Sequence, residues 1–325
     1  MTRSIYAALL AVLLMWGCST APTIKDVENV APDTRVAFGT AEVFVDGEQE
    51  TWGGKFTGHN YFYLLVLPPD TSEAISYRLD KDGAFFWALE PGEYTLLGYH
   101  WQNLQTQRWG DIHATFTVPE GGPDTYLGSI VFRGNIAYLA TILEDRFEQV
   151  SALYDSKFPD RRGTALRQLF ETPQQIGHFT AVSGQCHDDW KIECTNRFHG
   201  VTPVAPEASQ SGFPIADTLK PEFRWKGCGR KDVSYDLILY EAAEFSVGGA
   251  LVPQYTRGRM AAYVEDLKEP RWLPDVALEP DTRYYWSVRL RDGDTVSRWS
   301  TLSHSTFLLV YASSGSGQWF QFKTT

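Results

Sequence analysis

Short apolar segments separated by turn residues run through the chain from residue 35 to residue 143. Ala41, Val43 and Val45 recur with a period of two, and residues 61–67 (YFYLLVL) form a continuous apolar run that ends at two prolines. Both patterns are typical of β-strands. Further strands are predicted at residues 84–89, 93–99, 113–118, 126–132 and 136–143. Short strands with a turn signal roughly every ten residues predict a β-sandwich.

The pattern becomes helical after residue 143. Apolar residues share one helical face at Phe147, Val150, Leu153 and Tyr154. This spacing predicts an amphipathic helix that ends at Pro159. Asp160 is a candidate N-cap for a second short helix. The apolar stripe of that second helix would consist of Leu166, Leu169 and Phe170. Residues 174–217 are irregular, so we expect residues 144–217 to connect two folded domains.

The last third of the chain, residues 218–325, returns to a strand pattern. Strands are predicted at residues 221–225, 233–240 and 319–322. Residues 278–289 (LEPDTRYYWSVR) resemble the corner and the following strand of fibronectin type III domains. The resemblance implies a fibronectin type III-like sandwich over residues 218–325. In related sandwiches a corner tyrosine sends its hydroxyl back to the upstream backbone, and Tyr284 stands at that position.

Residues 89–94 (LEPGEY) resemble a short hairpin motif of prealbumin-like and carboxypeptidase-regulatory-like sandwiches. The resemblance implies a prealbumin-like sandwich over residues 35–143. Pro91 and Gly92 would form its turn, because proline presets φ and glycine accepts a positive φ. The expected fold class is therefore mainly β, with two β-sandwich domains joined by a short helical and disulfide-looped segment.

The N-terminus carries the pattern of a targeting signal. Arg3 precedes an apolar run of about a dozen residues that ends in Gly17 and Cys18. A membrane-spanning helix needs roughly 20 apolar residues, so this run is too short to span a bilayer and fits a cleaved secretory signal. The end of the run resembles a bacterial lipoprotein signal. The resemblance implies removal of residues 1–17, lipidation of Cys18 and a polar tether over residues 18–34.

The residues around Cys18 bear on the destination of the protein. An alternative to lipidation is ordinary signal cleavage after Ala21, where Ser19 and Ala21 give the small-x-small pattern. In the lipoprotein family an aspartate after the cysteine retains the protein at the inner membrane, and here that position is Ser19. We therefore expect a lipid-anchored protein of the cell envelope, at the outer membrane and facing either the periplasm or the surface.

Composition narrows the class of partner. The chain has a formal net charge of −11, and loss of Arg3 with the signal makes it −12 (−11 − 1). A strongly negative chain without a basic stripe repels phosphate backbones, so we expect no nucleic-acid partner. Aromatic residues make up 14% of the chain, which favours β-rich packing. We expect an envelope protein or a glycan as the partner, and we expect the lipid to attach the protein to the membrane.

Three cysteines lie in the mature chain beyond the lipidated one. In an oxidising compartment an odd number leaves one pair and one unpaired thiol. Cys186 and Cys194 enclose a short loop whose closure costs little entropy, so we predict their disulfide and leave Cys228 unpaired. Together with His187 and His199 the same pair could form a zinc site. The disulfide is favoured because structural zinc sites usually have closer cysteine pairs.

The sequence offers no constellation of catalytic residues. His187, Asp188 and Asp189 are suited to acid–base work or metal binding, but adjacent residues on a strand point to opposite faces. The Gly-x-Ser-x-Gly pattern of a nucleophile elbow does not occur, and the paired glycines precede no helix that could bind phosphate. We therefore predict no catalytic residues, no metal and no cofactor. A hydrolase whose residues converge only in three dimensions stays an alternative.

Aromatic and planar polar side chains gather between residues 100 and 109. Trp101, Gln102, Asn103 and Trp109 are candidates for contact with a glycan, because indole faces suit the C–H groups of sugars and amides suit their hydroxyls. The competing interpretation is that Trp101 and Trp109 pack across neighbouring strands. The leading functional hypothesis is a non-enzymatic binding or scaffolding lipoprotein, and the alternative is a carbohydrate- or peptidoglycan-binding accessory protein.

Overall fold

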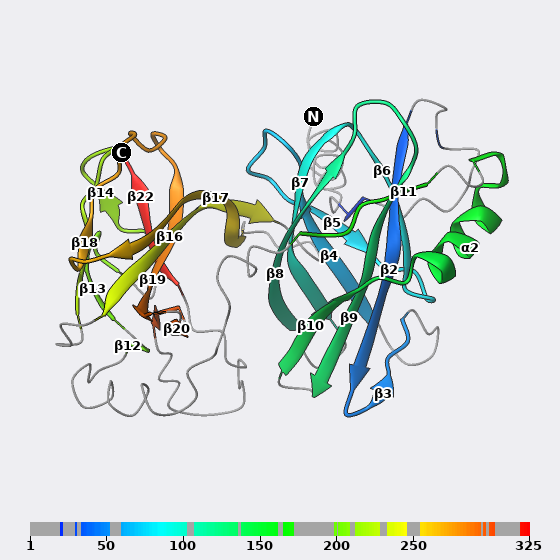
Figure 1. Cartoon of the computed structure of the whole chain (residues 1–325), viewed down its shortest axis with the longest axis horizontal. Helices are drawn as coiled ribbons and strands as arrows, with labels where there is room; N and C mark the ends of the chain where they lie inside the picture. Colours follow the sequence, from blue (N-terminus) through cyan, green and yellow to red (C-terminus); the bar gives the residue numbers. More distant parts are fainter. Residues whose placement is uncertain are drawn as a thin grey trace, which may run out of the picture. The chain divides into compact units, whose positions relative to one another are not determined.

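The computed structural model describes residues 20–21, 30, 34–52, 60–102, 107–135, 138–161, 165–171, 198–199, 201–208, 212–227, 233–245, 254–293, 295–296, 299–302 and 319–325 (Figure 1). The chain divides into two compact units. Unit 1 comprises residues 1–171 together with residues 244–256, and unit 2 comprises residues 172–243 and 257–325. Within the described ranges, no helix has the length and apolar character needed to cross a membrane.

Two sheets build unit 1. Sheet A has the strand order β1 (Thr20–Ala21), β5 (Ile75–Arg78), β4 (Tyr61–Leu67), β7 (Gly92–Gln102) and β8 (Gln107–Val118). Sheet B has the order β10 (Tyr138–Glu144), β9 (Thr125–Asn135), β2 (Arg35–Val45) and β3 (Glu48–Gln49). Two further strands join sheet B, since β6 (Ala84–Leu89) pairs with β2 and β11 (Leu166–Arg167) pairs with β9.

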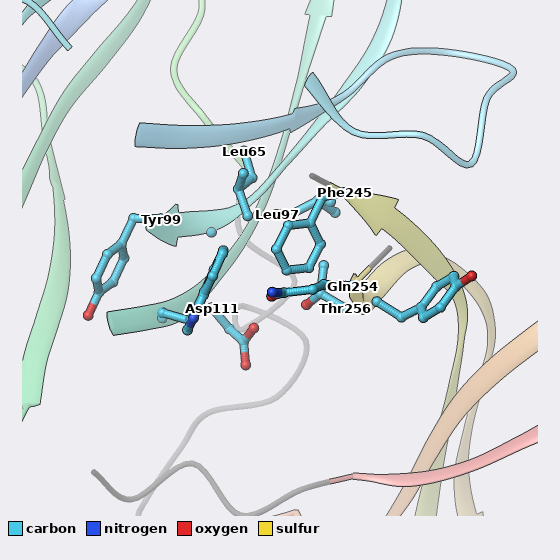
Figure 2. Close-up of a pocket in the computed structure, with 11 residues that line it drawn as sticks. Leu65, Leu97, Tyr99, Asp111, Phe245, Gln254 and Thr256 are labelled. Atoms are coloured by element: carbon cyan, nitrogen blue, oxygen red, sulfur yellow. The ribbon is translucent and has the colours of Figure 1, made fainter. Parts of the chain in front are cut away.

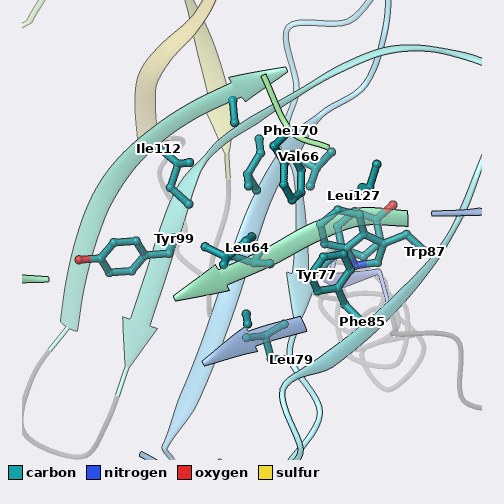
Figure 3. Close-up of a cluster of buried hydrophobic side chains, with 14 of the residues drawn as sticks. Leu64, Val66, Tyr77, Leu79, Phe85, Trp87, Tyr99, Ile112, Leu127 and Phe170 are labelled. Atoms are coloured by element: carbon teal, nitrogen blue, oxygen red, sulfur yellow. The ribbon is translucent and has the colours of Figure 1, made fainter. Parts of the chain in front are cut away.

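The core of unit 1 lies between these two sheets. Alternate residues of each strand point into it, as the period of two requires. Sheet A contributes Phe62, Leu64 and Val66 from β4, and sheet B contributes Phe85 and Trp87 from β6. Figure 3 shows Leu64, Val66, Phe85 and Trp87 in this core. Unit 1 is therefore a β-sandwich, and the strands predicted at residues 61–67 and 84–89 are confirmed with their bounds.

The connection between β6 and β7 differs from the prediction. Residues 89–94 were expected to form a hairpin, but β6 pairs with β2 in sheet B while β7 pairs with β4 and β8 in sheet A. Pro91 and Gly92 therefore carry the chain from one sheet to the other. The hydroxyl of Tyr94 donates a hydrogen bond to the carbonyl oxygen of Glu90 at 2.9 Å, which fixes this crossing.

The first predicted helix is confirmed, and it covers the outer side of sheet B. Helix α2 spans Phe147–Lys157 and buries Val150 and Tyr154, whereas Leu153 remains exposed. The buried pair packs with Phe38 of β2 and Phe158 in a second cluster of apolar side chains. A short 3₁₀ turn, η2 (Pro159–Arg161), follows.

The second predicted helix is wrong. Residues 165–171 are extended, because their backbone joins strands of both sheets. Leu166 and Phe170 donate their N–H groups to Asp124 and Leu127 at 2.6 and 2.9 Å, on the side of sheet B. Glu171 then exchanges two hydrogen bonds with Thr115 of β8 in sheet A, at 2.7 and 2.8 Å. Phe170 enters the core between the sheets, so this segment closes one side of the sandwich.

Unit 2 is a second sandwich. Sheet C has the order β14 (Ile215–Ala216), β22 (Phe320–Thr324), β19 (Arg283–Asp292), β16 (Ser234–Phe245) and β17 (Gln254–Leu267), and β20 (Thr295–Val296) pairs with β19. Sheet D has the order β13 (Thr202–Ala205), β15 (Phe223–Lys226) and β18 (Arg271–Trp272). The short strands β12 (Phe198–His199) and β21 (Thr301–Leu302) pair separately. Phe223 and Trp225 of sheet D pack with Leu239 and Trp286 of sheet C in the core.

The tyrosine corner predicted in unit 2 is confirmed. The backbone N–H of Glu279 donates a hydrogen bond to the hydroxyl oxygen of Tyr284 at 3.0 Å. The ring of Tyr284 is fully buried and stacks on Phe322, with ring centroids 5.4 Å apart. Both sandwiches therefore use a tyrosine hydroxyl to hold the segment that leads into a central strand.

A buried ion network crosses sheet C of unit 2. Asp236 is 0% exposed, and its carboxylate accepts hydrogen bonds from Nε of Arg289 and Nε of Arg291, both at 2.8 Å. Arg289 is itself 1% exposed, donates to the hydroxyl of Tyr263 at 2.8 Å and lies over the ring of Trp299. Each buried charge in the network thus has an opposite charge at hydrogen-bond distance, as burial of charge requires.

Candidate functional site

The outer face of sheet A carries a row of stacked rings. The strand register places Tyr63 of β4 opposite His100 of β7, and His100 opposite Trp109 of β8. The rings of Tyr63 and His100 lie 5.7 Å apart and those of His100 and Trp109 lie 3.8 Å apart, each pair within 17° of parallel. Phe245, which also belongs to unit 1, packs on Trp109 at 4.9 Å. The row ends at this pair of aromatic rings.

His100 occupies an unusual environment in the middle of that row. Its side chain is 1% exposed, and neither ring nitrogen has a hydrogen-bond partner among the described residues. Burial disfavours the charged imidazolium and lowers the pKa of His100 from 6.5 to about 4. The imidazole is therefore neutral at neutral pH and acts as a flat spacer between Tyr63 and Trp109.

The next row along sheet A lacks a side chain at its centre. Leu65 of β4 lies opposite Gly98 of β7, and Gly98 lies opposite Asp111 of β8. Only glycine fits here, since a Cβ on Gly98 would come within 2.2 Å of the carbonyl oxygen of Gly110. The missing side chain leaves a hollow on the outer face, between the aliphatic chain of Leu65 and the carboxylate of Asp111.

A β-bulge beside Gly98 shapes this hollow. The register between β7 and β8 shifts between Leu96 and Gly98, so that Ile112 and His113 face the single residue Leu97. His113 takes a φ of 52°, the left-handed conformation that an extra residue in a bulge can adopt. Bulges re-aim neighbouring side chains, and Leu97 lines the hollow together with Leu65.

The hollow is one wall of a pocket of about 230 Å³, which we call the Gly98 pocket. Sheet A provides Leu65, Leu97, Gly98, Trp109 and Asp111. The opposite wall consists of Phe245 and residues 254–256 (Figure 2). All of these residues belong to unit 1, which includes the last two residues of β16 and the first three of β17. Figure 2 also shows the ring of Tyr99 directed away from the other labelled side chains, in keeping with its place in the core.

The polar groups of the Gly98 pocket come from both walls. Gln254 and Thr256 are alternate residues of β17, so their side chains lie on one side of the strand, and Asp111 stands on β8. The hydroxyl of Tyr255 donates to Oε2 of Glu244 at 3.3 Å. The described lining contains no lysine, arginine or histidine. The pocket therefore presents one carboxylate, one amide and one aliphatic hydroxyl among apolar and aromatic surfaces.

The structure does not bring the two predicted glycan-binding tryptophans onto one surface. Trp101 is 4% exposed, lies in the core of unit 1 and donates from Nε1 to Oδ1 of Asn60 at 2.7 Å. Trp109 is 37% exposed and lies on the outer face, stacked on His100. Gln102 is half-buried at the end of β7, and Asn103 lies outside the described residues. Among the members of the predicted set that the structure describes, Trp109 alone lines the pocket.

The remaining predicted site residues lie outside the described part of the chain. This applies to Cys18, to the predicted disulfide of Cys186 and Cys194, and to Cys228. It applies equally to the histidine and aspartates at 187–189. Within the described residues, no group of three His, Cys, Asp or Glu side chains could hold a metal ion.

Of the described lining, sequence reasoning singled out only Trp109; it missed the glycine that forms the hollow, Gly98, and the polar side chains Asp111, Gln254 and Thr256. A glycine inside an apolar strand signals a bulge or a close approach of backbones, so Gly98 could have been singled out. The other three carry no local signal, since a lone aspartate on a strand and a Gln-Tyr-Thr segment are ordinary surface patterns.

Comparison with known proteins gives structural likenesses only. No family model and no curated protein matches the chain. Similar solved structures include the FN1–FN3 domains of chicken CNTN1, at 9% identity and a TM-score of 0.21, over 95% of this chain and 66% of that one. A DUF3823 family protein from Bacteroides ovatus matches at 10% identity and a TM-score of 0.17, over 83% of this chain and 97% of that one. A DUF3823 family protein from Parabacteroides merdae matches at 12% identity and a TM-score of 0.17, over 84% and 98%. At such TM-scores none of these likenesses carries an argument about function.

Proposed function

We propose that the protein is a non-enzymatic binding protein of the bacterial cell envelope, held to the outer membrane by a lipid on Cys18. It acts on a glycan or protein partner through the faces of its sandwiches. The observation that supports this best is the make-up of the Gly98 pocket. General acid–base catalysis uses titratable groups within hydrogen-bond reach of the reacting atoms, and glycoside hydrolysis uses a pair of carboxylates. The described lining has the carboxylate of Asp111 and no second one, which favours recognition without bond-making.

The proposal includes the identities of the two sandwiches. We propose a prealbumin-like domain over residues 35–143 and a fibronectin type III-like domain over residues 218–325. The hydrogen bond from the Glu279 N–H to the Tyr284 hydroxyl supports the second identity. The sequence of residues 89–94 is the basis for the first, although this segment crosses between the two sheets and does not form a hairpin, with the Tyr94 hydroxyl bonded back to Glu90.

Attachment to the membrane is tested with Cys18→Ser. We expect the variant to appear in the soluble fraction of the cell envelope and to lose metabolic labelling with a fatty acid, whereas Cys228→Ser keeps both properties. Unchanged fractionation and labelling of Cys18→Ser would contradict lipid anchoring.

Binding without catalysis is tested with the purified mature chain and two probes, peptidoglycan sacculi and a panel of neutral polysaccharides. We expect saturable binding to at least one probe, with no new reducing ends after prolonged incubation. Release of reducing ends would establish an enzyme. Absence of binding to both probes and of any co-purifying envelope protein from native membranes would refute the proposed function.

A further inference from the structure

We infer that unit 2 pairs with a second copy of this chain, edge to edge, through β17. The two copies of the strand lie antiparallel about a two-fold axis at Ala262 and join two copies of sheet C into one continuous sheet. The inference goes beyond the proposed function, because it concerns contact of the protein with itself and needs neither the lipid nor the Gly98 pocket.

Strand β17 is the edge strand of sheet C and is unusually long. It spans Gln254–Leu267, whereas a strand typically has about five or six residues. It pairs with β16 on one side, and among the described residues no strand pairs with its other side. An edge strand presents a row of backbone N–H and C=O groups with which another strand can pair. The edge of β17 therefore offers the backbone groups that strand addition uses.

The middle of this edge lacks the features that usually keep strand edges apart. Such edges are commonly protected by proline, by charged side chains or by a bulge. Residues 260–264 (MAAYV) contain no proline and no charge, and none of them has a positive φ. The regular strand ends at Asp266, which takes a φ of 58°. Met260 is 44% exposed at this edge, so a second strand can cover an apolar side chain here without burying a charge.

Charges of opposite sign flank the uncharged middle. Arg259 precedes it and Glu265 follows it, at equal distances from Ala262. In an antiparallel pair centred on Ala262, Arg259 lies directly opposite the partner's Glu265. Two-fold symmetry forms this contact twice, because a symmetric interface pairs residue i with j and j with i. Opposite charges directly across a strand pair stabilise it, so the strand is complementary to itself in this register.

Both charged side chains can take this additional partner. Glu265 accepts hydrogen bonds from the hydroxyl of Tyr263 at 2.8 Å and from Arg291 at 2.9 Å, and both end on Oε1. Its side chain is 47% exposed, and Oε2 can accept from a further donor. Arg259 has contacts within its own chain. A guanidinium has five N–H donors, so these contacts and a carboxylate of the second copy can be satisfied together.

The same register matches the uncharged positions. Met260 lies opposite the partner's Val264, and Ala261 lies opposite the partner's Tyr263. Successive residues of a strand point to opposite faces, so these two pairs lie on different faces of the joined sheet. Apolar side chains therefore meet across the new pairing on both faces, which is how neighbouring strands stabilise one another.

Neighbouring registers fit less well. A centre at Ala261 would place Arg257 opposite the partner's Glu265, but the guanidinium of Arg257 lies over the rings of Trp319 and Tyr240, at 4.1 and 5.6 Å. A centre at Tyr263 would place Glu265 opposite the partner's Ala261, without an opposite charge. The register centred on Ala262 is therefore the one that the charges select.

The test measures self-association of the full mature chain with Cys18→Ser, which removes the site of lipidation. Sedimentation equilibrium over a wide range of protein concentration gives the mass in solution. A strand pair of this length buries little area, so we expect a reversible dimer that forms as the concentration rises. We expect no larger species, because a two-fold contact closes on itself. A chain that stays monomeric at the highest concentration reached, or that forms open-ended oligomers, would overturn the inference.

Charge reversal tests the register. Arg259→Glu and Glu265→Arg each place like charges opposite one another twice, and we expect each to weaken the dimer by about tenfold or more. The double variant restores opposite charges and should regain most of the affinity. Glu148→Arg reverses a charge at an exposed position on α2 and should leave the dimer unchanged.

The single variants and the double variant give a clear decision. Urea unfolding checks that each variant folds, since Glu265→Arg also loses its contact with Arg291. If Glu265→Arg does not fold, the comparison of wild type with Arg259→Glu decides alone. A dimer equally strong in wild type and Arg259→Glu would refute the register, as would a folded double variant whose dimer is no stronger than that of the single variants.

Discussion

Acidification should weaken unit 1 through the buried imidazole of His100. The pKa of this side chain is about 4 in the folded protein, against about 6.5 in an unfolded chain. Below pH 6.5 the unfolded state therefore binds a proton that the folded state excludes. The stability that His100 contributes is fully present above pH 6.5 and is lost as the pH falls towards 4.

The size of the loss follows from the two pKa values. At pH 5 the difference in proton binding is RT ln[(1 + 10^1.5)/(1 + 10^−1)], which is about 2 kcal/mol. At pH 7 the same expression gives a small fraction of that energy. A loss of about 2 kcal/mol is large against the 5–15 kcal/mol that typically separates folded from unfolded proteins, so the effect lies well within reach of a denaturation experiment.

The assay compares wild type with His100→Phe, which keeps a flat ring between Tyr63 and Trp109 and cannot titrate. Urea unfolding at pH 7 and at pH 5 gives the change in unfolding free energy for each protein. We expect the wild type to lose about 2 kcal/mol more than His100→Phe between the two pH values. The other titrating groups are the same in both proteins, so their contributions to the change in unfolding free energy cancel in this difference. Equal losses in both proteins would show that the burial of His100 does not control its protonation, and the reasoning would fail.

Three further predictions concern single contacts. Gly98→Ala should lower the unfolding free energy by about 1–3 kcal/mol, because its Cβ would lie 2.2 Å from the Gly110 carbonyl oxygen. Thermal melting checks this effect, and an unchanged melting temperature would contradict it. Tyr284→Phe should lower the unfolding free energy by about 1 kcal/mol or more, since the Glu279 N–H would lose its acceptor. An unfolding free energy in urea equal to that of wild type would argue against the tyrosine corner. Asp236→Asn should lower the unfolding free energy by about 3–5 kcal/mol, because Arg289 would stay buried without its counter-charge. The double variant with Arg289→Met should recover part of this loss. An Asp236→Asn variant as stable as wild type in urea would refute the role of the network.

Most strands could be predicted from the sequence, because the signals that define them lie within the strand and its flanking residues. Residues 61–67 and 84–89 are apolar runs bounded by proline or turn residues, so their type and bounds follow from the residues themselves. The second helix was wrongly predicted because its apolar spacing fits a helix. The backbone partners that make the segment extended come from elsewhere in the chain, namely Thr115 of β8, Leu127 of β9 and Asp124 just before β9. Tertiary hydrogen bonding outweighed a weak local preference.

The site could be predicted only in part, because the register of the strand pairing decides which side chains share a face of the sheet. Whether Trp101 or Trp109 faces the core is decided by the pairing of β7 with β4 and β8, and the pairing places His100, not Trp101, opposite Trp109. A shift of one residue would reverse both faces. Gln254 and Thr256 belong to the pocket through the fold of unit 1, although about 150 residues of chain separate them from Gly98. The predictions for Cys18, Cys186 and Cys194 stay predictions, since these residues lie outside the described part.

The segment from Leu166 to Glu171 has a consequence for biogenesis. It is the last piece of the continuous stretch 1–171 to be synthesised, and its Phe170 stands edge-on to Phe116 at 5.5 Å within the core. A nascent polypeptide that has advanced only as far as residue 144 therefore holds strands of both sheets without the segment that closes one side of the sandwich. Apolar side chains would face the surroundings until about thirty more residues emerge, and a chaperone would have most to shield during this interval.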